Sequence, residues 1–266
     1  TNGPYGGDVR CFVVSGTNLF AGTYGGVFLS TNNGSSWTQS GLIGSNVISL
    51  AVSGTNLFAG TEGGGVFLST NNGTNWISVS NGLPILGPGT SRYTEITALA
   101  SSGSNLFAGT YDSGVFRSTD NGTSWIAVNT GLHIFVHSLA VSGTNLFAGT
   151  YGGVYLSTNE GTSWTKTGLT RVNALAVNDT NLFAGTEYGV YRSTNNGTSW
   201  TDVNSGLTNS DVRSLAVTGT NLYSGTYGGG IFLSTNNGTS WTDVNSGLTN
   251  SDVRSLAVTG TNLYSG

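Results

Sequence analysis

Charge is scarce in this sequence, and its scarcity removes several classes of function. Only 8% of the 266 residues are Asp, Glu, Lys or Arg, and eight basic against twelve acidic residues give a formal net charge of −4. Because proteins that bind nucleic acid neutralise phosphates with clustered Lys and Arg, no nucleic-acid partner is expected. The same shortage argues against binding to anionic membrane surfaces.

Long apolar runs and cysteine pairs are missing as well. The longest wholly apolar stretches have three or four residues, such as 134–136, whereas a membrane-spanning helix needs about 20. We therefore expect no membrane insertion. The single cysteine, Cys11, cannot form an internal disulfide, and no Cys/His cluster has metal-ligand spacing, so neither a metal nor another cofactor is implied. No signal-like segment opens the chain, so we expect that any secretion signal was removed or never present.

Internal repetition is the strongest feature of the sequence. Six octets share the form Ser-Thr-Asn/Asp-x-Gly-x-x-Trp and contain all six tryptophans, which follow one another at intervals of 36 to 49 residues. The octets are 30–37, 69–76, 118–125, 157–164, 193–200 and 234–241. A second element, Gly/Asp-Thr/Ser-Asn-Leu-Phe/Tyr, occurs seven times, starting at residues 16, 54, 103, 143, 179, 219 and 260. Self-similarity at such a period dictates the whole fold.

Each repeat is predicted to form four short strands. In one repeat these are 212–217, 221–225, 231–234 and 241–244, with alternating apolar residues and turns rich in Gly, Asn and Ser. No segment has a helical period of useful length. Tandem four-stranded units of this size are typical of β-propeller blades, so the predicted fold class is all-β, a β-propeller. We name the strands of a blade A, innermost, to D, outermost.

The octets resemble the Asp-box, the BNR-type repeat found in the propellers of sialidases, xyloglucanases and sortilin-like receptors. In that repeat, we expect the Asx oxygen to accept backbone N–H bonds within a tight turn and the tryptophan to cover the hairpin. The residues that carry the resemblance are Asn32, Trp37, Asn71, Trp76, Asp120, Trp125, Asn159, Trp164, Asn195, Trp200, Asn236 and Trp241. Five of the six Asx positions are Asn, which favours a structural role over an acidic or calcium site.

The predicted blade number is seven, with an incomplete last blade. Seven A–B halves but only six C–D halves are present, so residues 1–266 are predicted to form a single propeller domain of six full repeats and a half repeat at 250–266. A six-bladed ring is the alternative. Under the first interpretation, either the natural chain continues beyond Gly266 or another chain segment pairs with the open last blade. Residues 201–225 and 242–266 are identical, which suggests a recent duplication.

A candidate binding face is formed by the B–C and D–A loops, where most differences between repeats lie. After strand B the repeats carry Tyr24, Glu62, Tyr111, Tyr151, Glu187 and Tyr227. Tyrosine rings beside glycines can stack on sugars while hydroxyls and carboxylates take the polar edges. The alternative is that each tyrosine packs on its neighbouring blade. An insertion around 82–93 explains the longest tryptophan interval, and serves either recognition or only as a surface loop.

Three arginines stand in register near the start of strand A. They are Arg10, Arg213 and Arg254, and each follows an aspartate two residues before it in the sequence. Residues i and i+2 share one face of a strand, so local ion pairs are one interpretation. An anion pocket at the mouth of the propeller channel is the other. Sialidases hold a carboxylate with three arginines, but their Arg-Ile-Pro segment is absent here.

The function predicted from sequence is a non-catalytic, bacterial-type extracellular binding propeller. It is secreted or on the cell surface and presents the loop face to a glycan or a protein partner. No catalytic residue is assigned, because no nucleophile and acid pair can be identified. A glycoside hydrolase is the first alternative, which two carboxylates at a separation of roughly 5 to 10 Å would favour. A structural repeat module of a larger surface or filament protein is the second.

Overall fold

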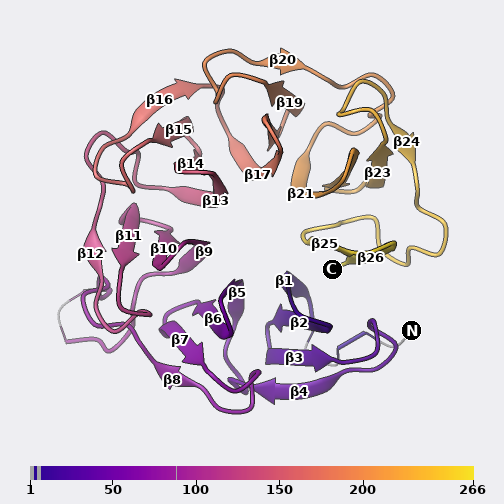
Figure 1. Ribbon diagram of the computed structural model, residues 1–266. Coiled ribbons are helices and arrows are strands. Elements are labelled where there is room, and N and C mark those ends of the chain that lie inside the picture. Colours follow the sequence, from indigo (N-terminus) through magenta and orange to yellow (C-terminus); the bar gives the residue numbers. More distant parts are fainter. Residues whose placement is uncertain (1–2, 5–6, 88) are drawn as a thin grey trace. The chain divides into compact units, whose positions relative to one another are not determined.

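The computed structural model describes residues 3–4, 7–87 and 89–266, whose strands form six four-stranded antiparallel sheets and one two-stranded sheet (Figure 1). In sheet order, the A strands are β1 (Val9–Ser15), β5 (Val47–Ser53), β9 (Ile96–Ser102), β13 (Val136–Ser142), β17 (Val172–Asn178), β21 (Val212–Thr218) and β25 (Leu256–Thr259). The B strands are β2 (Asn18–Thr23), β6 (Asn56–Thr61), β10 (Asn105–Thr110), β14 (Asn145–Thr150), β18 (Asn181–Thr186), β22 (Asn221–Thr226) and β26 (Asn262–Ser265).

Six repeats continue with a C and a D strand. The C strands are β3 (Gly26–Ser30), β7 (Gly65–Ser69), β11 (Val115–Ser118), β15 (Gly153–Ser157), β19 (Gly189–Ser193) and β23 (Gly230–Ser234). The D strands are β4 (Thr38–Gly41), β8 (Ile77–Ser78), β12 (Ile126–Ala127), β16 (Thr165–Gly168), β20 (Thr201–Asp202) and β24 (Thr242–Asp243). The chain divides into two compact units: one comprises the described residues up to Thr130 with Ile134–Val136, and the other comprises Gly131–His133 and His137–Gly266.

The predicted count of seven blades is corrected by the structure, which has six complete four-stranded blades, as in the alternative interpretation. The last half repeat forms the separate two-stranded sheet β25–β26. The physical reason is that a complete blade needs a C strand on the outer side of its B strand. No described strand pairs with β26 in that position.

Short hairpin turns set the register of every A–B pair. In the first sheet Ser15 pairs with Asn18, so the connection is a two-residue turn that begins at Gly16 with φ +61°. A positive φ at the first turn position matches the twist of the two strands and favours glycine there. Asp179 takes the same position before β18 with φ +51°, which is consistent with the tolerance of Asp for this region.

The core lies between successive sheets within each unit. Phe20 of β2 and Val27 of β3 are fully buried and pack with Val47 and Leu57 of the next sheet. The corresponding phenylalanines of the following repeats are equally buried. The alternation of apolar and small residues in each Asn-Leu-Phe-Ala-Gly-Thr strand thus fills a thin inter-sheet layer.

The octet turns are held by side-chain to backbone hydrogen bonds. In the last octet, the Gly238 N–H donates to Ser234 Oγ at 2.8 Å, and the Ser240 N–H donates to Asn236 Oδ1 at 2.9 Å. Asp120 accepts the equivalent bond from the Ser124 N–H, also at 2.9 Å. Asn and Asp therefore supply the same acceptor oxygen in these turns, and the acid is not required for them.

Three octet tryptophans illustrate two ways of packing against the preceding sheet. After the D strands β8 and β20, the indole N–H groups of Trp125 and Trp241 donate to Val79 O and Val203 O, both at 2.7 Å, and each side chain is 4% exposed. After the longer strand β16, Trp200 lies over Gly168 and is only half-buried, and its indole nitrogen has no hydrogen-bond partner. The length of the D strand therefore decides how deeply the next tryptophan is buried.

Trp125→Ala is expected to destabilise the protein by about 3–5 kcal/mol, because it removes a buried indole and leaves a cavity. Trp200→Ala is the matched control in a shallower site and should cost at least about 1 kcal/mol less, since no indole hydrogen bond is lost. Denaturant unfolding followed by circular dichroism measures both values. Equal losses of stability in the two variants would contradict this account of the packing.

Candidate binding face of the B–C and D–A loops

Each B–C loop is fixed at its base by a buried threonine. The hydroxyl of Thr23, the last residue of β2, donates to Gly26 O at 3.0 Å, and Thr150 makes the equivalent bond to Gly153 O at 2.9 Å. The equivalent threonines of the other four complete sheets, Thr61, Thr110, Thr186 and Thr226, bond in the same way. The residue that follows this threonine is therefore held on a short, rigid turn.

The tyrosines on these turns face solvent. The exposed fractions are 53% for Tyr24, 51% for Tyr111, 50% for Tyr151, 55% for Tyr188 and 55% for Tyr227, whereas Tyr155 inside strand β15 is 8% exposed. Tyr111 also makes an edge contact with Phe135, with ring centroids 5.4 Å apart. About half of each ring surface is thus open to a ligand.

The densest side-chain cluster on this face surrounds Arg171. Its guanidinium lies 5.2 Å from the ring centroid of Tyr151 and 6.0 Å from that of Tyr188, and it binds Glu187 Oε2 at 2.5 Å. The hydrogen bond and charge of Glu187 raise the pKa of Arg171 above its ordinary value. Arg171 has φ +54°, and its N–H donates to Tyr151 O at 2.9 Å. Two half-exposed rings and one neutralised ion pair therefore form a compact surface.

Arg10 and Arg213 occupy equivalent bulges in β1 and β21. Val9 and Cys11 pair with consecutive residues of β2, so Arg10 between them is the extra residue of the bulge. Arg213 is the extra residue of β21 in the same way. Bulges re-aim side chains. The guanidinium groups lie 5.1 Å from the Tyr24 ring centroid and 5.6 Å from that of Tyr227, respectively.

The aspartate partners of two arginines are in place. Arg213 binds Asp211 at 2.7 Å, and Arg254 binds Asp252 at 3.0 Å. Arg10 belongs to the first compact unit, while Arg213 and Arg254 belong to the second. An anion pocket made by all three arginines therefore stays a prediction.

Several carboxylates of the first unit interact with Glu95. Burial is the main cause that raises the pKa of Glu95, and the charges of Glu62 and Asp112 raise it further, while Arg10 lowers it. Glu62 accepts a 2.7 Å bond from Asn46 and lies 4.0 Å from Arg92. Glu95 therefore sits among charges of both signs at the start of β9.

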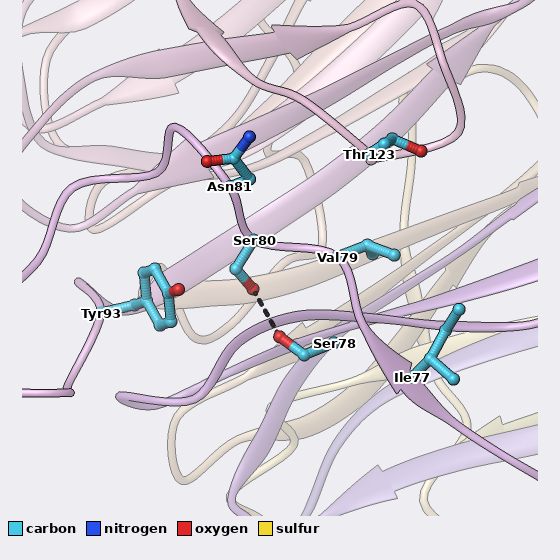
Figure 2. A pocket seen from close by; sticks show the side chains of 7 residues that line it. All are labelled: Ile77, Ser78, Val79, Ser80, Asn81, Tyr93 and Thr123. Carbon is cyan, nitrogen blue, oxygen red and sulfur yellow. Dashed lines mark hydrogen bonds between the residues drawn. The ribbon is translucent and has the colours of Figure 1, made fainter.

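The insertion at 82–93 builds one wall of a pocket beside β8. The pocket has a volume of about 470 Å³ and is lined by Ile77, Ser78, Val79, Ser80, Asn81, Tyr93 and Thr123 (Figure 2). Ser78 Oγ and Ser80 Oγ are 3.3 Å apart, and all the lining side chains are uncharged. Tyr93 comes from the insertion and is held there by its N–H, which donates to Gly63 O at 2.9 Å. Pro88 lies outside the described residues.

Sequence reasoning missed Arg171, Tyr188 and Glu95. Tyr188 was overlooked because Glu187 occupies the aligned position directly after the strand-B threonine. Arg171 lies in a D–A loop whose path depends on positive φ values at Leu169 and Arg171, which the residue types do not signal. The shifted pKa of Glu95 arises from neighbours distant in sequence.

The described ranges lack two kinds of feature. Within them, no group of three or more His, Cys, Asp or Glu side chains is placed to hold a metal ion. No helix in the same residues has the length and apolar character needed to cross a membrane. Burial raises the pKa of the Cys11 thiol to about 12, so this cysteine is a poor nucleophile at neutral pH.

Solved structures similar to this chain are β-propellers with different activities. The extracellular domain of the putative hybrid two-component system BT4673 from B. thetaiotaomicron matches 97% of this chain and 37% of its own length, at TM-score 0.76 and 17% identity. YCF48 bound to a D1 peptide matches 97% of this chain and 89% of its own length, at TM-score 0.75 and 15% identity. The GH74 xyloglucanase from Xanthomonas campestris matches 95% of this chain and 49% of its own length, at TM-score 0.73 and 16% identity.

These similarities define the fold and nothing finer. The chain is an all-β protein with the β-propeller fold and four-stranded blades. No protein-family model matches the sequence. No curated protein sequence matches it either. The chain spans about a third of the BT4673 domain structure, and its neighbours include both hydrolases and proteins of other kinds. Fold alone therefore does not assign an activity.

Glu95→Gln is expected to raise the melting temperature at pH 7. Because the folded protein raises the pKa of this carboxyl, ionised Glu95 destabilises the fold at neutral pH, and this cost disappears as the pH falls through the raised pKa. The difference between the variant and the wild type should vanish below about pH 4, where the carboxyl is protonated in both states. Thermal unfolding at several pH values measures it. A difference independent of pH would argue against the assigned environment.

Proposed function

We propose that this protein is a non-catalytic extracellular propeller that binds glycans on its B–C and D–A loop face. The observation that carries the proposal is the group of half-exposed tyrosines on rigid turns, which are Tyr24, Tyr111, Tyr151, Tyr188 and Tyr227. Rigid aromatic rings offer a large contact area at a small entropy cost, because few torsions must be ordered on binding.

The Arg171 cluster is the proposed centre of this face in the second unit. Tyr151 and Tyr188 offer ring surface for the C–H groups of a sugar. Arg171 and Glu187 pair with each other and retain further donor and acceptor positions for hydroxyl groups. Because their charges cancel, the cluster suits a neutral oligosaccharide better than a strongly charged one.

An extracellular location is consistent with composition and with one structural neighbour. The chain contains few charged residues and many Gly, Ser, Thr and Asn, and the BT4673 neighbour is an extracellular domain. Binding to a protein partner at the same face is the alternative, and YCF48 bound to a D1 peptide is a propeller of similar fold. The glycan is favoured here because the exposed aromatic residues of the face are tyrosines beside polar groups.

A glycoside hydrolase is the second candidate, and Glu95 is the observation that favours it. A carboxyl with a raised pKa is what a general acid requires, and Glu62 and Asp112 are carboxyl groups that interact with it. A xyloglucanase is among the structural neighbours. The binding proposal needs only the exposed tyrosines and the Arg171 cluster, whereas a hydrolase needs in addition a second carboxyl at a suitable distance from Glu95.

The double variant Tyr151→Ala/Tyr188→Ala should lose at least about fivefold in affinity for a glycan that the wild type binds, because each ring contact contributes about 0.5–1.5 kcal/mol. A glycan array identifies the binders, and calorimetric titration with xyloglucan oligosaccharides gives the first affinities. Tyr111→Ala tests the same role in the first unit.

Ile126→Ala is the matched control for the double variant. Ile126 is as exposed as Tyr188, but it belongs to the outer strand β12 of the first unit and not to a B–C or D–A loop. The affinity of the Ile126→Ala variant for the glycan should equal that of the wild type. Unchanged binding by the double variant, with its melting temperature preserved, would defeat the proposal.

Incubation with polymeric xyloglucan separates the two candidate functions. We expect no increase in reducing ends in the presence of the wild-type protein. Hydrolysis that is abolished by Glu95→Gln, with binding retained, would replace the binding proposal by the hydrolase. Hydrolysis unaffected by Glu95→Gln would reject both the non-catalytic role and this choice of acid.

A further inference from the structure

Asn–Gly pairs recur along this chain. Five of them fall at the same place in the octets, at 33–34, 72–73, 121–122, 196–197 and 237–238. A sixth, 81–82, lies in the loop after β8, and a seventh, 2–3, lies partly outside the described residues. Asparagine before glycine is a labile group, because no Cβ of the next residue hinders attack of its backbone nitrogen on the side chain. The fold can protect or expose each pair.

The reaction at such a pair needs only water. The backbone nitrogen of the glycine loses its proton and forms a bond with Cγ of the asparagine, and the side-chain amide leaves as ammonia. A cyclic succinimide remains. Water then adds to one of the two carbonyl carbons of the ring and opens it, which gives either aspartate or isoaspartate. A glycine N–H that is held in a hydrogen bond therefore opposes the first step.

In the octets, a serine holds the attacking nitrogen. The Gly197 N–H donates to Ser193 Oγ at 2.8 Å, and this glycine is buried. The equivalent bonds of the other four Asn–Gly octets measure 2.8–2.9 Å. Ser193 Oγ donates its own proton to Asn195 Oδ1 at 2.9 Å, so it acts as an acceptor toward the glycine. A neutral acceptor stabilises the protonated amide and disfavours the nitrogen anion that attacks.

The glycine, and not the asparagine, distinguishes the pair at 81–82 from the others. Four octet asparagines are exposed, as Asn81 is, namely Asn33, Asn72, Asn121 and Asn196. Gly82, in contrast to the octet glycines, is exposed as well. Among the described residues, its N–H has no hydrogen-bond partner. The nitrogen of Gly82 is therefore available for the reaction.

Asn81 and Gly82 occupy the middle of a tight turn. The Leu83 N–H donates to Ser80 O at 3.1 Å, and Gly82 has φ +93°, as the third residue of a type II turn requires. The side chain of Asn81 lines the pocket beside β8 (Figure 2) and makes no hydrogen bond to another described residue. Neither the attacking nitrogen nor the amide that it attacks is held by a hydrogen bond.

The backbone carbonyl of Asn81 adds an activating contact. The Trp125 N–H donates to Asn81 O at 2.9 Å. When the Gly82 nitrogen loses its proton, the negative charge is shared with this oxygen through the peptide bond. A donor already aimed at the oxygen stabilises the reactive anion. The contact that joins two neighbouring sheets therefore also favours the reaction in the loop that it holds.

One octet pair separates activation from protection. Asn237 O accepts a hydrogen bond from the Arg192 guanidinium at 3.2 Å, while the Gly238 N–H remains bonded to Ser234 Oγ at 2.8 Å. Asn237 is expected to react slowly, because its glycine nitrogen must first leave the serine. The serine bond is thus the deciding contact in the octets.

We propose that Asn81–Gly82 is a site of spontaneous deamidation and isoaspartate formation, and that the octet serines protect the five equivalent pairs. The product places a carboxylate in a pocket whose lining side chains are otherwise uncharged. Isoaspartate also adds a methylene to the backbone of the turn that accepts the Trp125 N–H, so the modified protein holds this tryptophan less firmly. The proposal is independent of the glycan-binding role of the loop face.

Peptide mapping by mass spectrometry of the incubated full chain tests the proposal. At mildly alkaline pH and below the unfolding temperature, Asn81 should deamidate at least about tenfold faster than each octet asparagine. A protease that cleaves before aspartate but not before isoaspartate should show that both products form. In urea the six rates should converge, because the contacts of the fold are lost. Equal rates in the folded protein, or the same excess at Asn81 in urea, would overturn the proposal.

Asn81→Ser removes the site without changing the turn. Ser205 stands at the equivalent position of the loop after β20, so the variant should fold normally. Incubated wild-type protein should lose at least about 2–4 °C in melting temperature as Asn81 is converted, and the incubated variant should not. Full conversion of Asn81 with an unchanged melting temperature would contradict the predicted effect on the Trp125 contact.

Two serine variants test the protection. Ser193 and Ser157 are both 1% exposed and bond the following octet glycine in the same way, but Glu160 replaces the asparagine in the octet of Ser157. Ser193→Ala should speed deamidation of Asn196 at least about fivefold. Ser157→Ala breaks the same kind of bond and should leave the rate at Asn196 unchanged. Equal acceleration of Asn196 by both variants would assign the rate to general loosening and overturn the protective role of the serine.

Discussion

The packing of an octet tryptophan on the sheet before it is the contact that joins neighbouring sheets within a unit. A single four-stranded sheet has two faces and an outer edge that it cannot cover by itself. Trp125 and Trp241 close this edge by inserting an indole against a valine carbonyl of the sheet before them. The glycine beside that valine lets the two backbones approach closely. Because each repeat provides both the tryptophan and the glycine, the contact can be repeated along the chain.

The sequence predicts the local structure well because that structure depends on neighbouring residues. The strands, the two-residue turns at Gly16 and its equivalents, and the class of fold follow from period and turn chemistry. The total of seven blades was predicted wrongly, because the last A–B half forms a separate two-stranded sheet and not a blade. The candidate site was predicted only in part. Tyr151 was placed by alignment, but its contacts with Arg171 depend on a loop path that spacing does not reveal.

The loop face combines rigid turns with exposed side chains. On the loop face, a buried threonine holds each turn, so tyrosines can stay exposed without loosening the sheet beneath them. Under the proposed function, a ligand is therefore recognised through side chains on turns that do not move.

The threonine bond at the base of every B–C turn also has an evolutionary consequence. Since Thr23, Thr150 and their equivalents anchor each turn within its own sheet, a mutation at the tip changes one exposed side chain and leaves the others in position. Tandem copies can then exchange tips by recombination, as in a combinatorial library. A lineage that duplicates and shuffles such repeats can sample new specificities without rebuilding its scaffold.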